Sequence, residues 1–236
     1  RICLYITEGM SEESASLPEF LQPLAKAVLG DPDALAACES RLVQVQKDMT
    51  VKFLVGRLEK VGCAVPPDFM RCSPCDGNDR VTGGFLGRVG EASPGDSGSS
   101  GANGDAVSSA SSQEYQPAIE MCAWKMPGTM FKQMLVHELI HAYDQCTREI
   151  DWRNPLQLAC SEIRAASLSG ECGYGRELVR GNTRWKGGHQ ICVKRRAALS
   201  VGMHHGEEVA QKAIEKVFDA CYKDTSPFER HPAHPY

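Results

Sequence analysis

His137-Glu138-Leu139-Ile140-His141 is the stretch that decides how this chain folds and what chemistry it offers. The two histidines are four residues apart, so on an α-helix they share one face and both imidazoles can reach one metal ion. Glu138 follows the first histidine, where its carboxylate can serve as the general base toward a metal-bound water. The HExxH pattern therefore predicts a zinc peptidase site on a helix, with Zn²⁺ as the Lewis acid.

The residues around this motif favour a buried helix over a surface helix that carries two solvated histidines. Apolar side chains recur at helical spacing through residues 130–143, namely Met130, Met134, Leu135, Leu139 and Ile140. A surface helix would carry more charge on its outer face. We expect Thr129, which follows Pro127-Gly128, to cap this helix at its N-terminus.

Two histidines do not complete a catalytic zinc site, which usually has three protein ligands and one open position. The downstream candidates are Asp144, Asp151, Glu162, Glu171 and His189. Asp144 fits better as an acceptor for an imidazole N–H than as a ligand. Glu162 is favoured as the third metal ligand because it lies on a separate predicted helix, and Asp144 and Asp151 remain the alternatives.

The helix that carries Glu162 is marked at both ends. Asn154 is a good N-cap, Pro155 suits the first helical position, and Gly170 suits the position after the last residue. One face holds Leu158, Glu162, Ala165, Ala166 and Ser169. Three of those side chains are small, so this face can approach a neighbouring helix closely. The structural alternative for Glu162 is a buried ion pair with Arg164 or another arginine.

Composition places the chain among ordinary globular proteins. It has 236 residues, with 24% charged and 42% hydrophobic residues, which is enough for one core or two small ones. A net charge of −4 and a pI near 6.0 give no signature of nucleic-acid binding. There is no apolar run of about 18 residues, the length that a membrane-spanning helix needs.

Cysteine is unusually frequent. The eleven cysteines are Cys3, Cys38, Cys63, Cys72, Cys75, Cys122, Cys146, Cys160, Cys172, Cys192 and Cys221. This density indicates either a disulfide framework or metal sites built from thiolates. An odd count leaves at least one thiol over, and Cys3 is the candidate.

The Cys72-Ser73-Pro74-Cys75 stretch has three interpretations: half of a zinc site, a redox pair, or two cysteines bridged to different partners. A four-cysteine zinc site would draw on Cys63 and Cys122, but their spacing matches no ribbon or finger. The strand and helix expected around a thioredoxin-like redox pair are missing. We therefore expect disulfide bonds.

The rest of the chain predicts a mainly helical α+β protein with a short sheet and a zincin-like metalloprotease core. Further helices are expected at 17–29, 32–61, 189–201 and 207–222, and strands at 81–86 and 118–124. The strand at 118–124 is either an edge strand that binds substrate backbone or a core strand. The expected organisation is a disordered piece at 1–16, a helical Cys-rich part at 17–86, a disordered Gly/Ser-rich insertion at 87–117, the HExxH core at 118–228 and a tail at 229–236.

Several stretches together resemble one family. They are His137-Glu-Leu-Ile-His-Ala-Tyr-Asp144, Asp151-Trp152, Ala159-Cys-Ser-Glu-Ile-Arg-Ala-Ala-Ser-Leu-Ser-Gly-Glu-Cys172, Cys72-Ser-Pro-Cys75, Val81-Thr-Gly-Gly-Phe85, His189-Gln-Ile-Cys-Val193, Arg195-Arg196-Ala197 and Asp224-Thr-Ser-Pro-Phe228. The pattern is similar to that of the mitochondrial inner membrane protease ATP23 family. It covers residues 38–228 apart from the insertion, and the joint pattern is far more specific than HExxH alone.

The resemblance implies a zinc metalloendopeptidase on the intermembrane-space side of the mitochondrial inner membrane, in peripheral contact with it. It implies that the protein processes, and helps to assemble, subunit 6 of the ATP synthase, and that the cysteines form disulfides. The family's metal ligands and base carry over onto His137, His141 and Glu138, whereas Glu162 remains an inference from helix faces. Tyr143 or His189 is a candidate donor to the oxyanion. Two alternatives stay open: a non-proteolytic assembly factor that uses the Cys-rich scaffold, and a thiolate zinc-binding adaptor.

Overall fold

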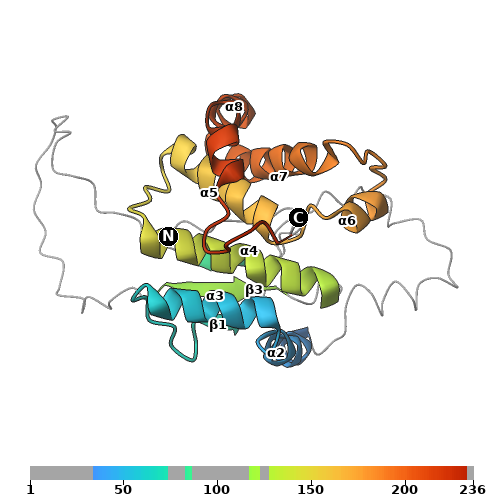
Figure 1. Ribbon diagram of the computed structural model, residues 1–236. Helices are drawn as coiled ribbons and strands as arrows, with labels where there is room; N and C mark the ends of the chain where they lie inside the picture. Colours follow the sequence, from blue (N-terminus) through green and yellow to red (C-terminus); the bar gives the residue numbers. More distant parts are fainter. Residues whose placement is uncertain (1–33, 74–82, 87–116, 123–127, 233–236) are drawn as a thin grey trace, which may run out of the picture.

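Helix α4 (Gly128–Thr147) runs through the middle of the molecule, between two layers (Figure 1). The computed structural model describes residues 34–73, 83–86, 117–122 and 128–232. One layer contains α2 (Ala34–Val45), α3 (Met49–Lys60) and the strands β1 (Met70–Cys72), β2 (Gly83–Leu86) and β3 (Ala118–Met121). The other contains α5 (Pro155–Leu168), α7 (Gly188–His205) and α8 (Glu207–Lys223), with the short α6 (Tyr174–Val179) at its edge. The predicted fold class, mainly helical α+β with a short sheet, is confirmed.

The sheet is small and mixed, in the order β1-β3-β2. Strand β3 pairs in parallel with β1, with Ile119 opposite Met70, and antiparallel with β2, with Ile119 opposite Phe85. Since β3 is the central strand, the interpretation of residues 118–124 as an edge strand is wrong, and the core-strand alternative holds. A side chain at position 83 would be crowded, because a Cβ on Gly83 would lie 3.1 Å from the Glu120 carbonyl oxygen.

Helix α4 is buried nearly all round, which is why its apolar pattern is wider than one stripe. Its buried side chains include the whole motif from His137 to His141 as well as Phe131, Leu135 and Asp144. The helix begins at Gly128, so Thr129 lies inside the first turn, and its predicted role as the N-cap is wrong. The motif therefore lies at the centre of the core.

The predicted helix at 32–61 is two helices. Helix α2 ends at Val45, and Asp48 caps α3 by accepting a 2.8 Å hydrogen bond from the amide of Thr50. An aspartate that can satisfy the first amides of a new helix favours a restart over continuation. The restart shifts the buried face, so Leu54 and Leu58 enter the core while Met49 stays 81% exposed.

Helices α5, α7 and α8 follow their predictions closely, whereas α6 was not predicted. The Asn154 side chain caps α5 by accepting from the amide of Leu156 at 3.0 Å, and Gly170 follows with φ +85°. Helices α7 and α8 extend slightly beyond 189–201 and 207–222. The predicted helix at 17–29, the N-terminal piece at 1–16 and residues 87–116 of the insertion lie outside the described residues.

All nine cysteines within the described ranges are disulfide-bonded, which confirms the predicted disulfide framework. The bridge Cys38–Cys72 joins α2 to β1, and Cys160–Cys221 joins α5 to α8, whereas Cys63–Cys146 and Cys172–Cys192 tie a loop to α4 and to α7, respectively. Because the sulfurs of Cys63, Cys72 and Cys122 are all bonded to sulfur, a zinc site that uses them is excluded.

No helix in the part of the chain that the structure describes has both the length and the apolar character needed to cross a bilayer.

Candidate active site

The two motif histidines meet Glu162 at the interface of α4 and α5. All three side chains are buried, with exposed fractions of 2% for His137, 0% for His141 and 2% for Glu162. Their ligand atoms all lie within 4.8 Å of one another. Among the described residues this is the one such group of three potential metal ligands. The helix spacing of the sequence and the small-residue face of α5 bring these side chains together.

The cluster fits a metal ion. The Nε2 atoms of His137 and His141 are buried and have no hydrogen-bond partner in the described structure. They lie 3.4 Å and 3.5 Å from the two oxygens of Glu162, respectively. Nitrogen and oxygen ligands at about 2.0–2.1 Å from a tetrahedral ion are themselves about 3.3–3.5 Å apart. Two imidazole nitrogens without hydrogen-bond partners and one carboxylate at that separation suit a divalent cation.

Electrostatics point the same way. Burial disfavours the imidazolium of His137, but the negative charges of Glu171 and Glu162 outweigh it and raise the pKa of His137 to about 10. Burial lowers the pKa of His141 to about 3, so this ring is neutral at physiological pH. The carboxylates thus attract one positive charge into the cluster, and a bound cation would satisfy that demand by displacing the proton.

His137 is oriented by a charged pair from outside the motif. Its Nδ1–H donates to the Glu171 carboxylate at 2.8 Å, because a carboxylate can only accept. The other oxygen of Glu171 accepts from Arg196 of α7 at 3.0 Å. Burial opposes the charge on Glu171, yet Arg196 and His137 hold the pKa of this carboxyl well below its usual range. This contact fixes Nε2 of His137 as the free, metal-facing nitrogen.

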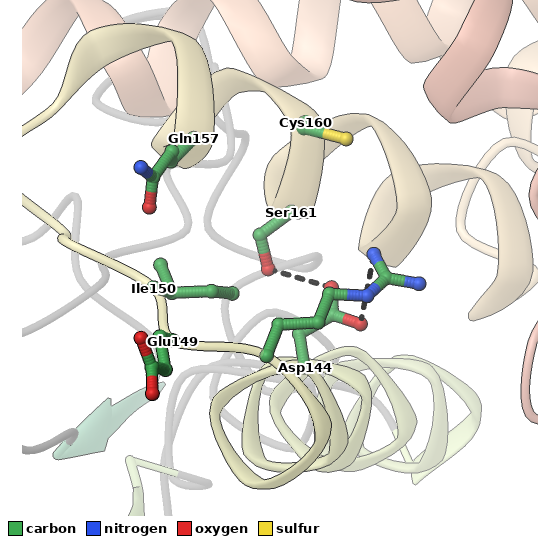
Figure 2. A pocket seen from close by; sticks show the side chains of 7 residues that line it. Asp144, Glu149, Ile150, Gln157, Cys160 and Ser161 are labelled. Atoms are coloured by element: carbon green, nitrogen blue, oxygen red, sulfur yellow. Dashed lines mark hydrogen bonds and ion pairs between the residues drawn. The ribbon is translucent and has the colours of Figure 1, made fainter.

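His141 is oriented by a neutral hydroxyl. Its Nδ1 lies 2.8 Å from the Ser161 hydroxyl, which in turn donates to Asp144 at 2.9 Å. Since the hydroxyl proton goes to Asp144, the His141 ring must be the donor at Nδ1. Figure 2 shows the Ser161 side chain directed at Asp144. The Trp152 ring stands edge-on to His141, with centroids 5.9 Å apart.

Arg164 anchors the Asp144 end of this chain of contacts. It is fully buried and contacts both oxygens of Asp144 at 3.1 Å through Nε. The same guanidinium donates to the carbonyl oxygens of Asp224 and Ser226, beyond the end of α8. Arg164 therefore pairs with Asp144 and Asp224, and the alternative of a Glu162–Arg164 ion pair is wrong.

Glu162 is held from α7. The Ser200 hydroxyl donates to its Oε1 at 2.5 Å. Burial raises the pKa of Glu162, but the two histidines and Ser200 outweigh this and lower it, so the group is a carboxylate ready to bind a cation. Ser200 carries no motif in the sequence, and only the packing of α5 on α7 reveals its contact with Glu162.

Glu138 is buried beside the cluster, and neither of its carboxylate oxygens has a hydrogen-bond partner among the described residues. Burial raises the pKa of Glu138 to about 8, and the charges of Glu162 and Glu171 act in the same direction. The His137 imidazolium and the nearby Phe85 amide oppose the shift. A carboxylate with a pKa near neutrality is suited to accept and return a proton.

The other candidates separate clearly. Glu171 accepts directly from Nδ1–H of His137. Asp144, predicted to accept from an imidazole N–H, accepts instead from the Ser161 hydroxyl that contacts His141. Asp151 lies at the surface, where its side chain accepts from the amide of Arg153. His189 bonds the Tyr222 hydroxyl at 2.8 Å and is not part of the cluster. Tyr143, the other predicted oxyanion donor, is half-buried against the core.

A pocket of about 230 Å³ borders the support of His141. Its lining, seen in Figure 2, comprises Asp144, Arg148, Glu149, Ile150, Gln157, Cys160 and Ser161. None of the three clustered metal-ligand candidates lines it. The pocket therefore borders Ser161 and Asp144, which lie behind His141, and is not lined by the proposed metal ligands.

An HExxH helix whose two histidines meet a buried glutamate from α5 is consistent with the class of metalloproteases. The chain belongs to the Peptidase M76 family, whose match extends over residues 36–229. The resemblance to the mitochondrial inner membrane protease ATP23 family is thus confirmed.

The relatives have long matches to this chain. It is 37% identical to the mitochondrial inner membrane protease ATP23 homolog of Xenopus laevis, over 77% of this chain and 67% of that protein. The human homolog is 35% identical, over 83% of this chain and 70% of its own length. For the Schizosaccharomyces pombe protease atp23 the identity is 33%, over 75% and 83%. No solved structure matches the chain.

Proposed function

We propose that this metalloprotease is a zinc-dependent endopeptidase in which His137, His141 and Glu162 hold the metal and Glu138 is the general base. The observation that carries the proposal is the pair of buried Nε2 atoms without hydrogen-bond partners, 3.4 Å and 3.5 Å from the Glu162 carboxylate. Two imidazoles and one carboxylate are a donor set typical of catalytic zinc.

When bound, the zinc ion supplies Lewis-acid catalysis at the scissile carbonyl. The chain's own residues do the rest. Glu138 takes the proton of the attacking water and passes it to the leaving amine, a transfer for which its raised pKa is suited. Glu171 and Ser161 hold the imidazoles so that both Nε2 atoms face the same point.

The deciding experiment measures zinc per chain for the purified protein and for His141→Ala, Glu162→Ala and Glu138→Gln. We expect about one zinc in the wild type and in Glu138→Gln, and a loss of zinc in the other two. Cleavage of a peptide substrate should fall by about 10³-fold or more in Glu138→Gln. Lys212→Gln, at an exposed ion pair on α8, is the matched control. Zinc retained by both ligand variants would overturn the assignment.

We propose further that the protein acts on the intermembrane-space side of the mitochondrial inner membrane, in peripheral contact with it, and processes subunit 6 of the ATP synthase. The relatives' names place them at that membrane as proteases, and the family resemblance supplies the substrate. In cells that lack the endogenous protein, Glu138→Gln should leave the subunit 6 precursor uncleaved. If that variant still restores assembled ATP synthase, assembly is a separate, non-proteolytic role of the scaffold.

A further inference from the structure

Basic residues gather in the segment that begins at Glu171, the glutamate that accepts from His137. Residues 171–206 contain seven Lys and Arg residues and two carboxylates, whereas the whole chain has a net charge of −4. Both carboxylates, Glu171 and Glu177, are buried. Glu177 faces inward to Arg180 at 3.0 Å and Arg195 at 2.7 Å. The exposed charge of this segment is therefore all positive.

Large apolar side chains lie exposed in the same segment, on α6 and the loop that follows it. The exposed fractions are 42% for Tyr174, 49% for Leu178, 82% for Val179 and 77% for Trp185. Tyr174 and Leu178 are four residues apart and share one helical face. The Tyr174 and Trp185 rings are in contact, with centroids 4.4 Å apart, which joins the helix to the loop. Figure 1 shows α6 at the outer edge of the molecule.

This surface is firmly attached to the catalytic domain. Arg180, at the end of α6, donates to the backbone carbonyl of Glu171 at 2.9 Å. The disulfide Cys172–Cys192 ties the start of the segment to α7. The exposed aromatic and aliphatic groups thus form a fixed protrusion beside the residue that orients His137. Apolar groups held out in water on an anchored element are a sign of an interaction site.

We propose that Tyr174, Leu178, Val179, Arg184, Trp185 and Lys186, here called the α6 surface, dock the protein on a bilayer that contains anionic lipids. Arg184 and Lys186 are exposed on either side of Trp185. Tryptophan and tyrosine favour the bilayer interface, and flanking basic side chains bind anionic headgroups. The absence of an exposed carboxylate from residues 171–206 favours a uniformly negative partner over a protein surface of mixed charge.

The inference rests on the proposed peripheral contact with the inner membrane and assigns the residues that make it. Since Glu171 is tied to both α6 and His137, docking would hold the catalytic cluster close to the bilayer surface. A protease placed in this way would act on segments of membrane proteins that emerge next to the headgroups.

The test is cosedimentation of the full chain with vesicles of phosphatidylcholine alone and of phosphatidylcholine with one-fifth cardiolipin. We expect binding to the cardiolipin vesicles, weakened by high salt. Arg184→Gln with Lys186→Gln should reduce the partition coefficient by about thirtyfold. Val179→Ala with Trp185→Ala should reduce it by about tenfold. Quenching of tryptophan fluorescence by brominated lipid should be lower in Trp185→Phe.

The controls remove the same charge, or two other exposed apolar side chains, elsewhere on the molecule. Lys212→Gln with Lys216→Gln on α8, and Val43→Ala with Met49→Ala on α2 and α3, change residues that are also exposed. Both control pairs should bind the vesicles as the wild type does, and all variants should cleave a soluble peptide at the wild-type rate. If the wild type binds but the α6 variants bind equally well, the α6 surface is wrong. If the wild type binds neither vesicle, the proposed membrane contact itself is overturned.

Discussion

The two sides of the catalytic cluster hold their histidines by different physics. On the side of His137, the imidazole donates directly to a buried carboxylate, Glu171, which is neutralised by Arg196. On the side of His141, a neutral hydroxyl, Ser161, stands between the imidazole and the buried Asp144–Arg164 pair. The first support places a negative charge directly on the imidazole of His137 and so affects how strongly that ring binds a metal ion. The second separates ligand orientation from the ion pair, which instead anchors the C-terminal segment.

The difference indicates a division of labour. A carboxylate bonded directly to an imidazole makes that ring a stronger metal ligand. The ion pair behind Ser161 contributes mainly to the fold, because Arg164 also reaches the carbonyl oxygens of Asp224 and Ser226. Changes on the His137 side should therefore affect metal affinity most, and changes at Asp144 should affect stability most. Both expectations can be measured.

The largest effect is expected for Asp144→Ala. It removes a carboxylate that is 0% exposed and leaves Arg164, also 0% exposed, with fewer counter-charges. Breaking a buried pair costs about 3–5 kcal/mol, and the remaining Asp224 contacts should keep this case near the lower limit, about 3 kcal/mol. Denaturant unfolding monitored by circular dichroism measures it. Asp151→Ala, at the surface, is the control and should change the free energy of unfolding little. An equally small change in Asp144→Ala would refute the anchoring role.

Glu171→Gln should affect zinc affinity more than the free energy of unfolding, the opposite of Asp144→Ala. The amide still accepts from His137 but no longer supplies charge to the ring or to Arg196. We expect zinc affinity to fall about 10–100-fold, the range for a partner of a metal-bound histidine. Competition with a chelator measures the affinity. Arg195→Gln, next to Arg196 but paired with Glu177, provides the control. A wild-type affinity in Glu171→Gln would mean that the two histidine supports do not differ in this respect.

Ser161→Ala should have a smaller effect than Glu171→Gln. It removes the acceptor for His141 Nδ1–H and leaves the Asp144–Arg164 pair in place. We expect a loss of zinc affinity of about tenfold and a destabilisation of about 1–2 kcal/mol from the unpaired imidazole donor. Ser161→Thr keeps the hydroxyl and should recover most of the affinity. If Ser161→Ala lost more affinity than Glu171→Gln, the proposed division of labour would be reversed.

The sequence predicts features set by residues close together in the chain better than features set by contacts between distant residues. The HExxH spacing, the Asn154 cap and the Gly170 stop are local signals, and each predicted its element correctly. The sequence does not predict the break between α2 and α3, because Val45 and Met49 on either side of residues 46–48 keep the helical spacing of apolar residues. The capping contact of Asp48 decides the outcome.

The supports of the site depend on long-range packing. Glu171 lies 34 residues from His137 in the sequence, and Ser200 lies 38 residues from Glu162. No local periodicity reports such contacts, so Ser161, Arg196 and Ser200 could not be given roles in advance. The family resemblance did mark Arg196 and the segment 224–228. The structure supplies the physical reason: Arg196 contacts Glu171, which orients His137, and the backbone carbonyls of Asp224 and Ser226 accept from Arg164, the partner of Asp144.

The smallest predicted effect concerns pH and the Asp224 end of the His141 support. Burial opposes the charge, but the Ser226 amide and Arg164 outweigh it and hold the pKa of Asp224 below its ordinary value of 3.8. A carboxyl with a lowered folded-state pKa stabilises the fold above its ordinary pKa, and that contribution is lost as the pH falls through the lowered value. Because Asp224 is 30% exposed, solvent screening limits its contribution to about 0.5 kcal/mol. Unfolding measured between pH 6 and pH 2 should lose less stability in Asp224→Asn than in the wild type. Parallel curves would show that Arg164 depends on Asp144 alone.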